Sequence, residues 1–224
     1  MNLLAIETAT ETVSVALDIN GDVCGNYEHA PRKHAELILP WVSELLADAG
    51  ISFSDLDAIA FSRGPGSFTS LRIGIGIVQG LAWASDCPVV PVSSLAATAQ
   101  TAVELGVKSA VVALDARMNE VFTGTFAVNS NGIMEPVSIE KVCAPEDVDL
   151  AESTETHGIG IGFERYPVLM QAADRLAAVH TDIWPKATSV IALAKEWLKH
   201  NEAISAELAQ PVYLRNDIAQ KPKP

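Results

Sequence analysis

The chain has 224 residues, of which 49% are apolar, and its formal net charge at pH 7 is −13. This length predicts one large or two small domains, and the apolar fraction is high enough for a hydrophobic core, which excludes a disordered chain. The negative charge argues against a broad nucleic-acid-binding surface, because such a surface needs clustered lysine and arginine. We therefore expect any contact with nucleic acid to be indirect, through a basic partner.

The cysteines and the apolar segments indicate where the protein resides. Cys24, Cys87 and Cys143 are odd in number and scattered, which fits neither a disulfide framework nor a metal site and favours a reducing compartment. We find no signal-peptide pattern, and the apolar run near residue 75 is too short and too rich in glycine to predict a membrane span. These features predict a cytoplasmic protein without membrane contact.

Apolar periodicity and turn residues predict a similar order of elements in each half of the chain. The first half is expected to contain strands at 2–7, 12–19, 23–28, 58–62 and 89–92, and helices at 33–49, 68–85 and 94–105. The second half is expected to contain strands at 110–115, 120–128, 137–143, 156–161 and from 179, and helices at 145–151, 163–174 and 188–200. Two such β-β-β-α-β-α-β-α units suggest the two-lobed α/β fold of actin, sugar kinases and Hsp70, with a cleft between the lobes.

The segment 61–84 (FSRGPGSFTSLRIGIGIVQGLAWA) is the most informative stretch. Two glycines around Pro65 allow a tight turn, and Ser67 and Thr69 are natural caps for the helix that follows. Such a strand–turn–helix junction directs backbone N–H groups at an anion. Glycines inside the helix cost about 1 kcal/mol each relative to alanine, so Gly74, Gly76 and Gly80 predict close approach by another backbone. A helix that is apolar on most sides is either a core helix or one shared with a partner subunit.

Several segments together resemble one protein family. They read LLAIETATETVSVAL, RKHAELILPWVSELL, FSRGPGSFTSLRIGIGIVQGLA, VSSLAATAQ, ALDARMNEVFTG and PVYLR, and they extend from residue 3 to residue 215. They are similar to the TsaB (YeaZ) family, the bacterial partners of the tRNA threonylcarbamoyl-transferase TsaD. The resemblance implies an actin-like (ASKHA) fold and a cytosolic scaffold role in making threonylcarbamoyladenosine beside the tRNA anticodon. It also implies TsaD as a partner and, through the TsaB–TsaD pair, the TsaE ATPase.

The resemblance extends to TsaD itself, which carries a zinc-binding H-x-x-x-H motif after the corresponding strand. Ser94 and Thr98 stand at the positions of the two histidines. Neutral hydroxyls hold a transition metal poorly, so we expect no metal site and no catalytic residues in this chain. The expected role is therefore that of a non-catalytic relative of TsaD.

Nucleotide-binding residues of the fold are also replaced. The first hairpin reads Glu7-Thr8-Ala9-Thr10 without a glycine, and TsaB relatives usually carry Asp at the position of Glu7. The second lobe opens with Asp115-Ala116-Arg117, where we expect a structural ion pair, with Arg117 in reach of Glu120, or a turn, rather than a catalytic group. Glu7, Thr8, Gly158 and Gly160 are retained as candidate nucleotide contacts. We expect no cofactor to bind the chain alone, with ADP or ATP at a subunit junction left open.

The expected mechanism is dimerisation through helices 33–49 and 68–85 of an N-terminal lobe at 1–105, with a C-terminal lobe and tail at 106–224. The chain is expected to form a homodimer, and TsaD would displace one copy. The predicted lining residues are Ile38, Trp41, Val42, Leu45, Ile73, Gly76, Ile77, Gly80 and Leu81.

Two alternatives from other classes remain open at the level of sequence. One is an actin-fold kinase or carbamoyl-transferase, and the other is a peptidase, although no G-x-S-x-G motif is present. His34 is expected to be a cap or packing residue rather than a general base. The tail Pro211 to Arg215 either folds back on the chain or reaches a neighbouring subunit.

Overall fold

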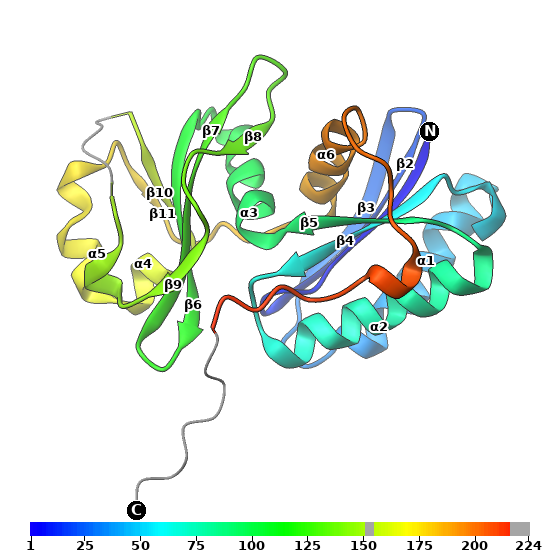
Figure 1. The fold of residues 1–224 in the computed structure, drawn as a ribbon, viewed down its shortest axis with the longest axis horizontal. Helices are drawn as coiled ribbons and strands as arrows, with labels where there is room; N and C mark the ends of the chain where they lie inside the picture. The colour runs from blue at the N-terminus through cyan, green and yellow to red at the C-terminus, as the bar shows by residue number, and fades with distance from the viewer. Residues whose placement is uncertain (151–154, 216–224) are drawn as a thin grey trace, which may run out of the picture.

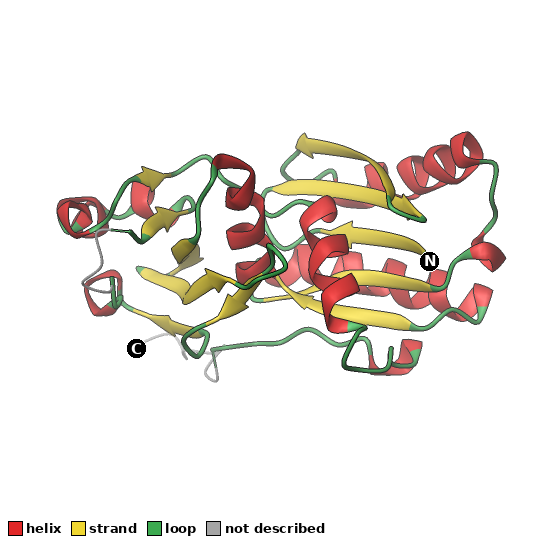
Figure 2. Ribbon diagram, turned by 90° about the horizontal axis from the view of Figure 1, so that it is seen from above, coloured by secondary structure: helices red, strands yellow, loops and turns green. Residues whose placement is uncertain are grey.

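The computed structural model describes residues 1–150 and 155–215. The described chain forms two α/β lobes that lie side by side, each built around one sheet (Figure 1). Figure 2 shows the two sheets next to each other along the long axis of the molecule, with helices packed against their faces.

The first lobe contains a five-stranded sheet with the order β3-β2-β1-β4-β5. Strands β1 to β3 are antiparallel, whereas β4 and β5 run parallel to β1. The strand bounds are β1 Asn2–Glu7, β2 Thr12–Ile19, β3 Asp22–His29, β4 Ala58–Gly64 and β5 Val89–Ser93.

Helices cover both faces of this sheet. Helices α1 (His34–Ala49) and α2 (Phe68–Ser85) pack on the face that carries Leu4 and Ile6. Helices α3 (Ser94–Ala102) and α6 (Ala187–Trp197) pack on the face that carries Ala5. Because both faces are covered, β1 is apolar at nearly every position instead of alternating.

The second lobe contains a sheet with the order β11-β10-β6-β7-β8, and β9 pairs with β7. Helix α3 packs on one face, so it is shared by the two lobes, and α4 and α5 pack on the other face. The bounds are β6 Ser109–Arg117, β7 Glu120–Val128, β8 Met134–Pro136, β9 Lys141–Cys143, β10 His157–Ile159, β11 Val179–His180, α4 Gly162–Arg165 and α5 Pro167–Gln171. Single 3₁₀ turns lie at Phe53–Asp55, Val103–Leu105, Pro145–Asp147, Ala173–Arg175 and Ala206–Leu208.

The predicted elements of the first half are confirmed to within two or three residues, and Gly50 ends α1 in the left-handed conformation with φ 67°. The second half departs from the prediction in three places. Of the strand expected at 137–143, only the end forms a strand, β9, because β8 already ends at Pro136. The helix expected at 145–151 is a single 3₁₀ turn. The helix expected at 163–174 is broken after Arg165, because Tyr166 precedes a proline and adopts extended backbone angles.

The C-terminal part of the chain does not stay in the second lobe. Helix α6 packs on the first sheet, Ile204 pairs with Val89 of β5, and the Val212 amide donates to the Arg63 carbonyl over 2.8 Å. The predicted division at 105/106 therefore needs correction, because residues 187–212 pack on the first lobe. Their apolar side chains cover a sheet face that would otherwise lie open to solvent.

Candidate functional site

The strand–turn–helix junction packs tightly against the first hairpin. A Cβ at Gly66 would lie 2.2 Å from the Ala9 carbonyl oxygen, and the Ser67 amide donates to that same oxygen over 2.8 Å. The Ser67 side chain makes no capping hydrogen bond and instead accepts one from the Ser70 hydroxyl. Ser67 thus occupies the predicted N-cap position, but the helix start is held through its backbone amide rather than through a side-chain cap.

A cleft of about 770 Å³ lies between the two lobes, in front of this junction. The first lobe contributes the tip of the first hairpin and the start of α2, and the second lobe contributes the turn after β6 and Arg165. The remaining wall comes from the C-terminal tail. The polar and aromatic lining residues are Thr10, Glu11, Arg32, His34, Ser67, Phe68, Thr69, Ser70, Asp115, Arg117, Phe122, Arg165, Trp184, Tyr213 and Arg215.

An ion-pair cluster joins the lobes across this cleft, and we call Glu11, Asp115, Arg117 and Arg165 the interlobe clasp. Arg165 contacts Asp115, and its Nη2 lies 2.9 Å from Oε1 of Glu11 in the other lobe. Nη2 of Arg117 lies 3.2 Å from the same Glu11 oxygen, and its Nη1 lies 3.3 Å from Oδ2 of Asp115. The turn expected at this segment is confirmed by the positive φ angles of Arg117 and its two successors, but Arg117 does not pair with Glu120, which pairs with Arg215.

The clasp holds both of its carboxylates in the charged form. Burial alone would raise the pKa of Asp115, but hydrogen bonds from the Tyr166 hydroxyl, the Arg117 amide and Arg165 outweigh it, so the pKa lies below its usual range. Burial opposes the shift at Glu11 too, where Arg165 and Arg117 lower the pKa. No sequence pattern pointed to Glu11 or Arg165, because they are 154 positions apart and meet only through the packing of the lobes.

Glu7 and Thr8 lie beneath the cleft and do not line it. Oε1 of Glu7 accepts a hydrogen bond from the Ala9 amide over 2.5 Å, whereas Oε2 is buried without a hydrogen-bond partner. Burial raises the pKa of Glu7 to about 7, although hydrogen bonds from Ala9 and Ser62 oppose that rise. The side chains predicted to contact a nucleotide are thus enclosed by protein.

The glycines at 158 and 160 are explained by packing within the second lobe. A Cβ at Gly158 would lie 2.7 Å from the Phe163 ring, and one at Gly160 would lie 2.7 Å from the Ala113 carbonyl oxygen. The space beside both glycines is therefore filled by the chain itself, and neither glycine lines the cleft. The prediction that Gly158 and Gly160 contact a nucleotide is therefore corrected: both glycines pack against side chains and backbone of the second lobe.

Ser94 and Thr98 are fully buried in α3, between the two sheets. The Thr98 hydroxyl donates to the Ser94 carbonyl over 2.7 Å, and the Ser94 hydroxyl has no partner. Across residues 1–150 and 155–215, no three or more His, Cys, Asp and Glu side chains are grouped in a way that could hold a metal ion. The packing role expected for His34 is confirmed, because its Nε2 lies 3.1 Å from the carbonyl oxygens of Thr10 and Thr12.

The nine predicted interface residues divide into two groups. Ile38, Val42 and Leu45 are buried in the core between α1 and the first sheet, so their assignment to a surface is wrong. The physical reason is that these three form the stripe of α1 that faces the sheet. The others lie at the surface or at its edge, and we call them the α1/α2 face: Trp41, Ile73, Gly76, Ile77, Gly80 and Leu81.

The α1/α2 face is apolar, and nothing from the described chain covers its glycines. A Cβ at Gly76 or Gly80 would have no heavy atom within 4 Å, and both residues are exposed. By contrast, a Cβ at Gly74 would lie 2.2 Å from the Thr8 hydroxyl oxygen. The predicted close approach by another backbone is therefore not found within the described chain, because the atoms nearest to Gly74 belong to the Thr8 side chain.

The tail folds back on its own chain and touches both lobes (Figure 1). Tyr213 packs on Phe68 of α2 with ring centroids 5.4 Å apart, and its hydroxyl accepts a hydrogen bond from Arg72 over 3.0 Å. Arg215 then reaches the second lobe, where it donates to the Ala116 carbonyl over 3.2 Å and pairs with Glu120.

The described part of the chain contains no helix with the length and apolar character needed to cross a bilayer.

Comparison with known proteins identifies a matching family model and relatives that match over the whole chain. Residues 27–223 match a family model described as TsaD, tRNA N6-adenosine threonylcarbamoyltransferase. The chain is 39% identical over 228 residues to the tRNA threonylcarbamoyladenosine biosynthesis protein TsaB of Escherichia coli, with 100% of this chain and 99% of that protein covered. It is 37% identical over 233 residues to the TsaB protein of Haemophilus influenzae, with 100% and 98% covered.

The solved structure of YeaZ from Pseudomonas aeruginosa superposes with a TM-score of 0.87 at 41% identity and covers 95% of this chain and 99% of that one. The superposition and the two-sheet architecture agree with the mixed α/β, ASKHA-like fold that the order of elements predicts. With full-length relatives and a matching structure in agreement, the chain belongs to the TsaB (YeaZ) family.

Proposed function

We propose that this chain is a scaffold subunit of cytoplasmic tRNA threonylcarbamoyladenosine biosynthesis and that it binds and positions a TsaD-type catalytic subunit. The relatives named above support the pathway. The observation that carries the scaffold role is the α1/α2 face, where apolar side chains and two open glycines lie together on neighbouring helices. Partly exposed apolar side chains beside two exposed glycines, on a chain with a net charge of −13, are typical of a protein–protein interface.

The two exposed glycines are the strongest feature of this face. Glycine inside a helix costs about 1 kcal/mol relative to alanine, and neither Gly76 nor Gly80 recovers that cost by packing within the described chain. A partner helix that packs against them would explain both. Small residues at such positions let two helix backbones approach closely, and the neighbouring Ile73, Ile77 and Leu81 then interdigitate with the partner's side chains.

The same face can serve two partners in turn. In the absence of the catalytic subunit, a second copy of the chain would cover the face with two-fold symmetry. A TsaD-type subunit built on a related lobe would then replace that copy. A stable interface of either kind should bury about 1,200 Å² or more in total. A TsaE-type ATPase would act on this pair, and ADP or ATP would bind at a subunit junction rather than to the chain alone.

A single substitution at the α1/α2 face tests the proposal. Ile77→Asp places a charge where the partner would bury an apolar side chain, so we expect a folded monomer that no longer co-purifies with the TsaD-type subunit. Size-exclusion chromatography of the chain alone, and after co-expression with that subunit, measures both effects.

Ile139→Asp is the matched control, because Ile139 is 90% exposed in the second lobe, away from α1 and α2. The control should leave both assemblies intact, and circular dichroism should show both variants folded. Normal assembly of the Ile77→Asp chain with the catalytic subunit would overturn the scaffold proposal.

A further inference from the structure

The arginines of this acidic chain gather at the mouth of the interlobe cleft. Of the seven arginines in the sequence, four line the cleft: Arg32, Arg117, Arg165 and Arg215. Arg72 donates to Tyr213, which also lines the cleft, and the Arg63 carbonyl accepts from the adjacent Val212. Arg175 lies in a 3₁₀ turn of the second lobe. Arginine differs from lysine in that its planar guanidinium both binds phosphate in a bidentate manner and stacks on rings.

Not all of this positive charge is neutralised by the protein. Three carboxylates, Glu11, Asp115 and Glu120, pair with Arg165, Arg117 and Arg215. Among the described residues, Arg32 and Arg72 form no ion pair, and both are exposed, as is neighbouring Lys33. The Arg117 side chain is 70% exposed despite its two carboxylate contacts. The cleft mouth therefore presents cations to solvent on a molecule that is otherwise strongly acidic.

Two aromatic rings and one guanidinium form a stack at this mouth. The Arg72 guanidinium carbon lies 3.8 Å from the centroid of the Phe68 ring, and Phe68 packs on Tyr213. The two rings remain 42% and 37% exposed. The hydrogen bond from Arg72 to the Tyr213 hydroxyl fixes the guanidinium in place. A flat cation held on a ring, beside a second exposed ring, is a surface on which nucleic-acid bases stack.

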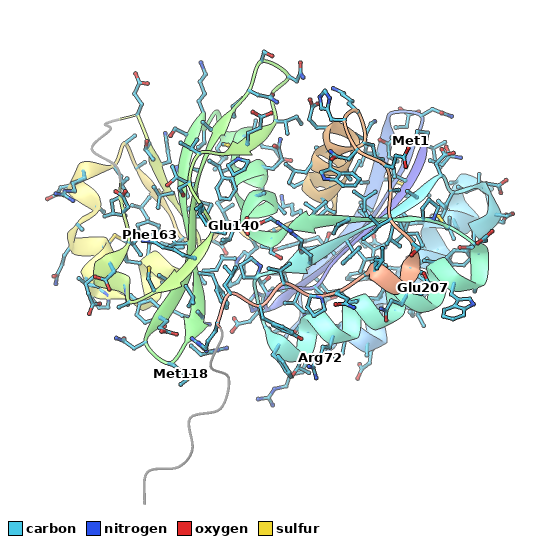
Figure 3. All side chains as sticks on the ribbon, viewed as in Figure 1. Met1, Arg72, Met118, Glu140, Phe163 and Glu207 are labelled. Carbon is cyan, nitrogen blue, oxygen red and sulfur yellow. The ribbon has the colours of Figure 1, made fainter. Side chains whose placement is uncertain are left out.

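This surface borders the α1/α2 face, because Gly76 follows Arg72 by four residues and lies on the same side of α2. Phe68 and Arg72 are four residues apart and lie on one side of α2, whereas Ile73, Ile77 and Leu81 follow a row that is turned by about 100° around the helix. Figure 3 shows Arg72 on the same edge of the molecule as Met118, which follows Arg117 in the second lobe.

We propose that the arginine–aromatic rim, defined as Arg32, Lys33, Phe68, Arg72, Arg117 and Tyr213, is a contact surface for a single-stranded loop of RNA. The inference rests on the proposed function, because the catalytic partner would hold the RNA nearby. The cations contact phosphates and the stack receives an unpaired base, which a duplex does not offer. The acidic remainder of the surface repels RNA and confines it to the rim.

The test measures RNA binding by the assembled complex of this chain with its TsaD-type subunit. The probe is a fluorescein-labelled 17-nucleotide RNA hairpin with a seven-nucleotide loop, followed by fluorescence anisotropy over a series of salt concentrations. We expect Arg32→Glu/Arg72→Glu to weaken binding about tenfold or more and to reduce the slope of log K against log salt by about 1.4, which is about 0.7 for each lost phosphate contact. Arg72→Lys should retain the salt slope but lose the stacking contribution.

Arg175→Glu is the matched control and should bind RNA like the wild type. An intact double-variant complex with unchanged RNA affinity and salt slope would overturn the inference while leaving the scaffold proposal standing. Equal binding of a blunt RNA duplex of the same length would likewise reject a single-strand surface. Failure of the wild-type chain to form the complex at all would overturn the proposed function and this inference with it.

Discussion

Gly74 and Gly80 lie in the same helix, α2, in opposite surroundings. A methyl group at Gly74 would collide with the Thr8 side chain, whereas one at Gly80 would enter open space. We expect Gly74→Ala to lower the free energy of unfolding by about 1–3 kcal/mol through overpacking. Gly80→Ala should raise it by up to about 1 kcal/mol, because alanine is the better helix former.

Urea denaturation at low protein concentration checks both values, because dilution keeps self-association from contributing to the measured stability. Equal effects of the two substitutions would contradict the packing described for α2. If the α1/α2 face binds a partner helix, Gly80→Ala should also weaken assembly while it stabilises the isolated chain.

Glu7 is a buried carboxyl group whose titration should be visible in the stability of the protein. Burial raises its pKa from the usual value of 4.5 to about 7. A group whose pKa is higher in the folded state stabilises the fold fully below its unfolded pKa. That contribution is lost as the pH rises through the folded value. Between about pH 4.5 and pH 7 the loss from Glu7 should amount to roughly 3 kcal/mol, at about 1.4 kcal/mol per pKa unit.

Glu7→Gln isolates this contribution, because glutamine has nearly the same shape and does not titrate. We expect the variant to lose the part of the pH dependence due to Glu7, so that its stability relative to wild type increases from pH 5 to pH 8. Denaturant unfolding at several pH values measures the difference. A difference that stays constant over this range would mean that Glu7 titrates at an ordinary pKa in the fold.

At the scale of single elements, the different sides of α2 make different contacts. Leu71, Ile75 and Val78 are buried on the side of the helix that packs on the first sheet. The α1/α2 face lies on a side that does not pack on that sheet. Phe68 and Arg72 contact Tyr213 of the tail. The sequence pattern alone showed a helix that is apolar on most sides. Only the position of the sheet and the tail separated the sides that the chain covers from those it leaves open.

The elements of the second half show where periodicity fails. The segment 163–174 has apolar spacing compatible with one helix, but Pro167 divides it into α4, α5 and a 3₁₀ turn. The proline and its extended predecessor, Tyr166, were visible in the sequence, so this break could have been predicted. By contrast, the bounds of β8 and β9, of which only β9 lies within the strand expected at 137–143, depend on tertiary pairing with β7.

The interlobe clasp is a property of the whole molecule. Arg165 brings its guanidinium between Glu11 of the first lobe and Asp115 of the second. Arg165→Leu would remove these contacts and leave Arg117 as the only ion-pair partner that the clasp offers to the two carboxylates. We expect faster amide hydrogen exchange at the tips of the first hairpin and of the β6–β7 turn, because the two lobes would separate there more often.

Hydrogen–deuterium exchange with mass spectrometry resolves these two segments, and Arg175→Leu is the matched control. Acidification should have the same effect in the wild type: the clasp lowers the pKa values of Asp115 and Glu11, so its stabilisation is present above their unfolded pKa and lost as the pH falls through the folded values. Unchanged exchange at both tips in Arg165→Leu would show that the tail and α3 alone hold the lobes together.

The sequence by itself determined the order of elements in the first half, the two-lobed fold and the family, because these depend on local apolar periodicity, turn residues and motifs such as GPGSFTSLRIG. The tertiary structure alone decided which of the nine proposed interface residues are core and which are surface. It also decided that α6 belongs to the first lobe and that Glu11 meets Arg165. The physical reason is that burial and ion pairing depend on contacts between residues far apart in the chain, and periodicity along one element carries no information about them.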